Sequence, residues 1–141
     1  MKLKVSRTDM WSVTIEDRAG GAAEKVELLA EAGANFEFVF ARRTPEQPGK
    51  GILFVLPVKG AKVLKAAQQA GLTKPENFHS VRIEGTDKPG TTAKITRALG
   101  NAGINFRALS ATAIGRTFVS YLALDTADDA AKAVSVLKKL S

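Results

Sequence analysis

Apolar positions recur along the chain at two spacings, and the change from one to the other occurs twice. Between residues 10 and 15 apolar and polar residues alternate, which is typical of a strand with one buried face. From Ala22 the apolar residues follow a helical spacing up to Gly33, where glycine favours the end of the helix. The first part of the chain therefore predicts a strand at 10–15, a helix at 22–33, strands at 36–41 and 52–58, and a helix at 61–70 with Val63, Leu64 and Ala67 buried.

The second part of the chain predicts the same series of elements. Thr126, followed three residues later by Asp129, resembles a capping box and marks the start of the last helix. The predicted elements are a strand at 80–85, a helix with Ile95, Leu99 and Ala102 inward, strands at 106–111 and 118–124 joined by a tight turn at 114–116, and a helix with Ala130, Val134 and Leu137 on one face.

The two halves also share individual residues at a constant offset of 70 positions. The matched residues are Asp17, Gly20, Gly33, Asn35 and Phe36, which recur as Asp87, Gly90, Gly103, Asn105 and Phe106. A fixed internal period is a sign of duplication. The repeat predicts two small modules, residues 1–77 and 78–141, with a hairpin loop about six residues longer in the first.

This order of elements predicts an α+β fold: two ferredoxin-like βαββαβ modules, each an antiparallel sheet with its helices packed on one face. The second module ends directly after its last helix, so its fourth strand is missing from the expected place. We expect the spare extended segment at residues 2–8 to fill that position and to tie the two copies together. In the first module only residues 72–78 could serve, and Pro75 disfavours a strand there.

Composition and charge limit the classes of function. The chain has no cysteine, which excludes a disulfide framework and a thiol nucleophile. No apolar stretch reaches the roughly 20 residues that span a bilayer, and we expect a cytoplasmic protein without a membrane partner. The net charge of +7 is divided evenly, with 11 Lys and Arg against 8 acidic residues in 1–72 and 10 against 6 in 73–141. No Lys/Arg-rich run marks a nucleic-acid site.

The turn before each first helix has the chemistry to bind a free amino acid. A glycine turn at a helix N-terminus presents unpaired N–H groups and the positive end of the helix dipole, which suit a carboxylate. Asp17 or Asp87 can accept from an ammonium group, and the amides of Asn35 or Asn105 can donate and accept. We expect these four side chains to lie at the same end of their sheets. The alternative is structural: the aspartates cap the helices and the asparagines serve the helix-end turns.

The segments 87–92 and 102–106, which read Asp-Lys-Pro-Gly-Thr-Thr and Ala-Gly-Ile-Asn-Phe, closely resemble the ACT domain family. The first module is a looser match, with Ala19 where proline is usual and Ala34 where isoleucine or valine is usual. The resemblance implies a stand-alone tandem ACT protein, non-catalytic and homodimeric, that binds a free amino acid or similar small ligand at a module interface. The implied ligand-binding residues are Asp87, Lys88, Gly90, Thr91, Asn105 and Phe106, with Asp17, Gly20 and Asn35 in the first module. It implies no cofactor and no metal.

Other functions remain open. The modules could form a ligand-free scaffold that docks on an enzyme in trans, a reading that the sequence does not separate from amino acid binding. Residues 50–55 partly match the strand signature of RNA-recognition motifs. However, Phe36, Phe38 and Phe40 share one face of their strand, and we expect that face to lie in the core beneath the helices. Nucleic acid is therefore not expected as a partner.

Catalysis has less support from the sequence. The single histidine, His79, opens a strand without a matched partner, and no paired carboxylates or metal-ligand spacing occur. The pair Arg42-Arg43 could clamp a carboxylate or phosphate, but the simpler interpretation is a solvated strand end.

Overall fold

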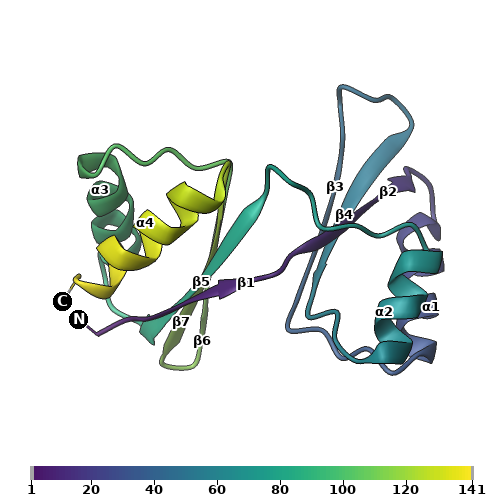
Figure 1. Ribbon diagram of the computed structural model, residues 1–141, viewed down its shortest axis with the longest axis horizontal. Coiled ribbons are helices and arrows are strands. Elements are labelled where there is room, and N and C mark those ends of the chain that lie inside the picture. The colour runs from purple at the N-terminus through teal and green to yellow at the C-terminus, as the bar shows by residue number, and fades with distance from the viewer. Residues whose placement is uncertain (1, 141) are drawn as a thin grey trace. The chain divides into compact units, whose positions relative to one another are not determined.

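The computed structural model describes residues 2–140 and divides into two compact units (Figure 1). Module 1 is the continuous segment Asp9–Pro75. Module 2 combines the segment that ends at Thr8 with the segment that begins at Glu76. Each module is an antiparallel sheet with helices, so the predicted α+β fold class is confirmed.

Module 1 contains three strands and two helices. They are β2 (Trp11–Glu16), α1 (Gly21–Glu31), β3 (Phe38–Arg43), β4 (Lys50–Leu56) and α2 (Ala61–Gln69). The sheet order is β2-β4-β3, and Leu53 and Val55 of β4 pack against Leu29 of α1 and Val63 of α2. In the place of a fourth strand there is a single antiparallel bridge from Ser12 to Thr73, with backbone hydrogen bonds of 2.8 and 3.0 Å.

Module 2 has four strands, because a segment from the start of the chain joins it. Its elements are β1 (Lys4–Thr8), β5 (His79–Thr86), α3 (Thr91–Asn101), β6 (Ala108–Ile114), β7 (Thr117–Leu124) and α4 (Ala127–Lys138). The sheet order is β1-β5-β7-β6, all antiparallel. In Figure 1 the purple β1 runs beside the teal β5.

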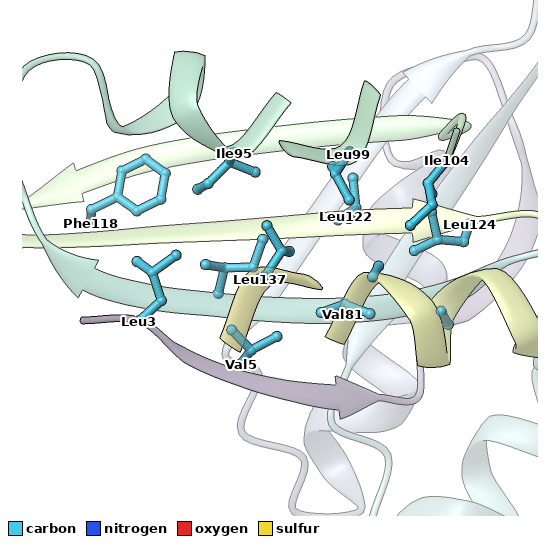
Figure 2. Close-up of a cluster of buried hydrophobic side chains, with 13 residues drawn as sticks. Leu3, Val5, Val81, Ile95, Leu99, Ile104, Phe118, Leu122, Leu124 and Leu137 are labelled. Atoms are coloured by element: carbon cyan, nitrogen blue, oxygen red, sulfur yellow. The ribbon is translucent and has the colours of Figure 1, made fainter. Parts of the chain in front are cut away.

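β1 occupies the edge next to β5, where a βαββαβ module has its fourth strand. The alternation of this segment explains the pairing: Leu3 and Val5 are buried, while Lys4 between them and Ser6 after them are exposed. Figure 2 shows Leu3 and Val5 in the same apolar cluster as Ile95, Leu99 and Leu137. A Cβ on Gly85 would lie 2.8 Å from Cδ2 of Leu3, so the glycine leaves room for that side chain.

Some predicted positions are wrong. Leu53 and Val55 are the core residues of β4, and the register pairs Phe40 with Phe54 between them, so Phe38 and Phe40 lie on the sheet face away from the helices. Phe40 is 46% exposed. Both faces of β3 are apolar, so the alternation did not identify the core face. Only Phe36, which precedes β3, packs against the core.

Three further expectations need correction. Leu64 is exposed and not part of the buried stripe of α2, and Ala102, the C-cap of α3, is also exposed. The β3–β4 connection spans residues 44–49 and the β6–β7 connection residues 115–116, so the difference is four residues and not six.

The net charge is divided unevenly between the two folded modules, in contrast to its even division along the sequence. Module 2 carries 12 Lys and Arg against 6 acidic residues, a net charge of +6, while module 1 carries 9 against 8, a net charge of +1. The difference arises because the N-terminal segment brings Lys2, Lys4 and Arg7 into module 2. Between residues 2 and 140, no helix has the length and apolar character needed to cross a bilayer.

Candidate functional site

The turn between β5 and α3 is held by hydrogen bonds to two backbone carbonyl groups. Gly90, the N-cap of α3, has a φ of 85°, a left-handed conformation that favours glycine. The Asp87 N–H donates to the Arg116 carbonyl at 2.8 Å and so ties the turn to the β6–β7 hairpin. The buried Thr91 hydroxyl donates to the Lys88 carbonyl at 2.8 Å. The turn therefore keeps its shape without using the Asp87 carboxylate.

The Asp87 carboxylate is available to a ligand. Asp87 and Lys88 are exposed, and within residues 2–140 neither side chain has a hydrogen-bond or ion-pair partner. No side chain caps α3, so the alternative in which Asp87 serves as a helix cap does not hold. The first turn of α3 also contains no acidic residue. An exposed carboxylate thus lies next to a helix N-terminus whose dipole no side chain offsets.

The matching turn of module 1 has the same backbone but different side-chain contacts. Gly20 has a φ of 88°, and the Asp17 N–H donates to the Gly49 carbonyl at 3.0 Å, as Asp87 does to Arg116. Here, however, the Asp17 carboxylate accepts a hydrogen bond of 2.8 Å from Nε of Arg43. The aspartate of module 1 is therefore occupied by a cation of its own module.

A second ion pair spans the same turn in module 1. Arg18 pairs with Glu24 in the first turn of α1 and donates from Nη1 to the Ala19 carbonyl at 3.2 Å. The hydrogen bond from Arg18 to Glu24, together with the charge of that carboxylate, raises the pKa of the Arg18 guanidinium. Glu24 also places a negative charge at the positive end of the α1 dipole. Sequence reasoning missed the contact between Arg43 and Asp17, because the two residues lie 26 positions apart.

The asparagines lie at the other end of each sheet, so the expectation of a single shared end is wrong. Asp87 follows Thr86, which pairs with Thr117. Asn105 precedes Ala108, which pairs with Ala123 near the opposite end of β7. The eight residues of β5 place the two side chains on the order of 20 Å apart. The physical reason is that α3 runs back along the sheet before Asn105 is reached.

Asn105 follows a helix-end turn and remains open to solvent. The Ile104 N–H donates to the Leu99 carbonyl at 2.9 Å, and Gly103 has a φ of 73°. Asn105 is exposed, and its side chain makes no hydrogen bond within the described part of the chain. Phe106, in contrast, packs against the core of module 2, which indicates a structural role. In module 1, Asn35 is likewise exposed and Phe36 packs against the core.

Other candidate residues have structural partners. A ring nitrogen of His79 donates to the Glu76 carbonyl at 2.7 Å, and Arg42 donates to the Arg43 carbonyl at 2.9 Å. No group of three or more potential metal ligands forms anywhere in residues 2–140. A shallow groove of about 370 Å³ runs along α3, but it contains none of the predicted site residues; Ala93, Lys94, Arg97, Ala98, Asn101 and Leu140 line it.

Comparisons with known proteins give one family match and several related folds. The model of the ACT domain family matches residues 79–141. No curated protein sequence matches the chain. Protein BT0572 from Bacteroides thetaiotaomicron has a similar structure, with a TM-score of 0.76 and 22% sequence identity over 96% of this chain and 89% of that one.

Two regulatory subunits are also similar. The regulatory subunit of aspartate kinase from Thermus thermophilus, in a ligand-free form, matches with a TM-score of 0.66 and 17% identity over 99% of this chain and 97% of that one. The corresponding subunit from Thermus flavus matches with a TM-score of 0.61 and 19% identity over the same shares of the two chains. At such identities the likeness establishes a common fold, and its coverage includes both modules.

Proposed function

Residues 79–141 form an ACT domain, and on this premise we propose that the protein is a non-catalytic regulator that binds a free amino acid or a similar small ligand between two such modules. The observation that carries the proposal is the open turn at α3. There an unpaired Asp87 carboxylate lies beside a helix N-terminus that lacks an acidic residue in its first turn. The carboxylate suits an ammonium group, and the helix N-terminus suits a carboxylate.

The separation of Asp87 and Asn105 determines how such a site would be assembled. The ammonium and carboxylate of one amino acid lie within about 4 Å of each other, whereas the two side chains are on the order of 20 Å apart. One ligand therefore contacts both only if they come from different modules. A second copy of the chain, related by a twofold axis, would bring Asp87 of one module 2 beside Asn105 of the other.

Regulation follows from a site of this kind. A ligand that contacts both copies stabilises the dimer arrangement in which both contacts are made. It shifts the population toward that arrangement only as far as its affinity differs between the alternative arrangements of the dimer. The likeness to regulatory subunits of aspartate kinase supports a partner enzyme whose activity depends on this arrangement of the two copies.

The test is a thermal-shift screen against each of the twenty protein amino acids. At a hundred times its dissociation constant, a bound amino acid stabilises the fold by roughly 2.7 kcal/mol. Asp87→Ala and Asn105→Ala should each abolish the shift. Glu27→Ala, which removes an exposed carboxylate of α1, is the matched control and should keep it. If no amino acid stabilises the well-folded protein, the scaffold alternative is favoured.

A mixing experiment tests the assembly of the site from two copies. Refolding Asp87→Ala together with Asn105→Ala yields mixed dimers in which one site has both side chains intact and the other has neither. Binding should then return at about half of the sites in the mixed dimers, although each variant alone is inactive. Failure of the mixture to bind, with wild-type protein active, would contradict the assembly of one site from two copies.

A further inference from the structure

We propose that only module 2 takes the amino acid, because module 1 holds its own charged side chains where the ligand's charges would bind. This inference rests on the proposed function and adds the number of sites per chain and the residues that determine it. It is drawn from three differences between turns whose aspartate N–H groups and helix starts make matching backbone hydrogen bonds.

The first difference is the cation at the aspartate. In module 1, Nε of Arg43 lies 2.8 Å from Oδ2 of Asp17, as a ligand's ammonium would. Arg43 pairs with Gly51 in the sheet, and the residue in the corresponding position of module 2 is Ala113, which pairs with Phe118. Alanine has no charge to offer Asp87. The carboxylate of module 2 is therefore open to an external cation, whereas that of module 1 is already paired.

The second difference is the charge beside the first turn of the helix. Glu24 of α1 carries a negative charge there and is paired with Arg18. The residue 70 positions later is Lys94, an exposed cation of α3. A ligand carboxylate that approaches α1 meets a carboxylate that is already paired with Arg18, and one that approaches α3 meets the exposed cation of Lys94. The attraction of a helix N-terminus for an anion is thus available only in module 2.

The third difference is the backbone at the helix start. A Cβ on Gly21 would lie 2.0 Å from the Glu16 carbonyl oxygen, which also accepts a hydrogen bond of 2.9 Å from the Arg18 N–H. The corresponding residue of module 2, Thr91, carries a full side chain. The start of α1 therefore lies closer to the Glu16 carbonyl oxygen than a residue with a Cβ would allow, and the two turns differ in shape at this point.

The net charges of the two modules agree with binding of the amino acid by module 2 alone. Module 2 has a net charge of +6 and module 1 of +1, so the field around module 2 favours an anionic group more strongly. A dimer of the chain would accordingly bind two amino acids, one for each open turn, and not four.

Isothermal titration with each of the twenty protein amino acids, at up to about 10 mM, tests the number of sites. A binding amino acid should saturate the wild-type protein at one molecule per chain. Asp87→Ala should abolish the binding heat, whereas Asp17→Ala, the matched change in module 1, should leave both stoichiometry and affinity as they are. Two molecules per chain, or equal losses in the two variants, would overturn the inference and leave the proposed function standing.

Transplanting the charged contacts of module 1 into module 2 tests their role directly. The double variant Lys94→Glu/Ala113→Arg introduces the counterparts of Glu24 and Arg43 at exposed positions, where neither change enters the core. Each of the two charged contacts acts at the surface and changes the dissociation constant by up to about fivefold. The double variant should therefore bind the amino acid about tenfold more weakly. Lys94→Gln/Ala113→Gln adds similar bulk without the new charges and should weaken binding by less than about threefold.

The outcomes separate the two proposals. An unchanged affinity in Lys94→Glu/Ala113→Arg, with wild-type protein binding normally, would contradict the inference alone. Equal weakening in the glutamine control would show that bulk and not charge matters, and would contradict it as well. If none of the twenty amino acids binds to the folded wild-type protein, the proposed function fails and the inference fails with it.

Discussion

Val5 of β1 lies directly opposite Ile83 of β5, although the two residues are 78 positions apart in the sequence. Both side chains are buried, with exposed fractions of 8% and 0%, and both belong to the core of module 2. The strand that completes module 2 thus comes from the start of the chain, before any residue of module 1.

The pairing of Val5 with Ile83 makes the N-terminal segment part of the stability of module 2. Val5→Ala removes two buried methyl groups and should destabilise module 2 by about 2 kcal/mol. Amide hydrogen exchange followed by NMR should show faster exchange in β5 and β7. Ser6→Ala, an exposed change on the same strand, is the control and should alter exchange little. Unchanged protection of β5 in Val5→Ala would contradict the role of β1.

Gly21 should be intolerant of any side chain. Its Cβ would lie 2.0 Å from the Glu16 carbonyl oxygen, so Gly21→Ala forces the turn or the helix to move, at a cost of about 2 kcal/mol or more. Gly100→Ala is a matched control in α3, where the nearest atom to the new Cβ would be 4.0 Å away. That control should stabilise the helix by up to about 1 kcal/mol. Urea denaturation of both variants gives the comparison, and a neutral Gly21→Ala would contradict the close approach.

Thr126 caps α4, and the loss of its hydroxyl should weaken that helix. The Asp129 N–H donates to Oγ1 of Thr126 at 3.0 Å, as the capping pattern predicted. Thr126→Ala should cost about 1 kcal/mol of unfolding free energy, and Thr126→Ser should recover most of it. Denaturation monitored by circular dichroism measures both. Equal losses in the alanine and serine variants would argue against capping.

Glu16 should titrate below the ordinary value of 4.5 for its pKa. The hydrogen bond from Lys50, 2.6 Å from Oε1, and the charge of that ammonium group both favour the carboxylate. Because the folded pKa is lowered, this contact contributes stability above the unfolded pKa and loses it as the pH falls through the folded value. NMR titration should show the lowered pKa of Glu16 and its return toward 4.5 in Lys50→Met. An unchanged pKa of Glu16 in Lys50→Met would contradict the role of Lys50 in lowering it.

The turns of the candidate site were predictable from the sequence, but their arrangement was not. The glycine turns at Gly20 and Gly90 follow from local backbone preferences, and both glycines adopt a left-handed conformation that glycine tolerates. The separation of Asp87 from Asn105 depends instead on the direction of each strand in the sheet. The contact between Arg43 and Asp17 depends on a strand pairing that brings distant residues together. Which residues act as ligand contacts stays a prediction.

By itself, the sequence determined the repeat, the order and type of the elements, and the turn residues, since all of these depend on periodicity and on interactions between near neighbours. Only the tertiary structure decided which face of β3 lies beneath the helices and which aspartate is left unpaired. The physical reason is that strand pairing joins segments distant in sequence, and a segment can pair only with an edge that the rest of the fold has left open.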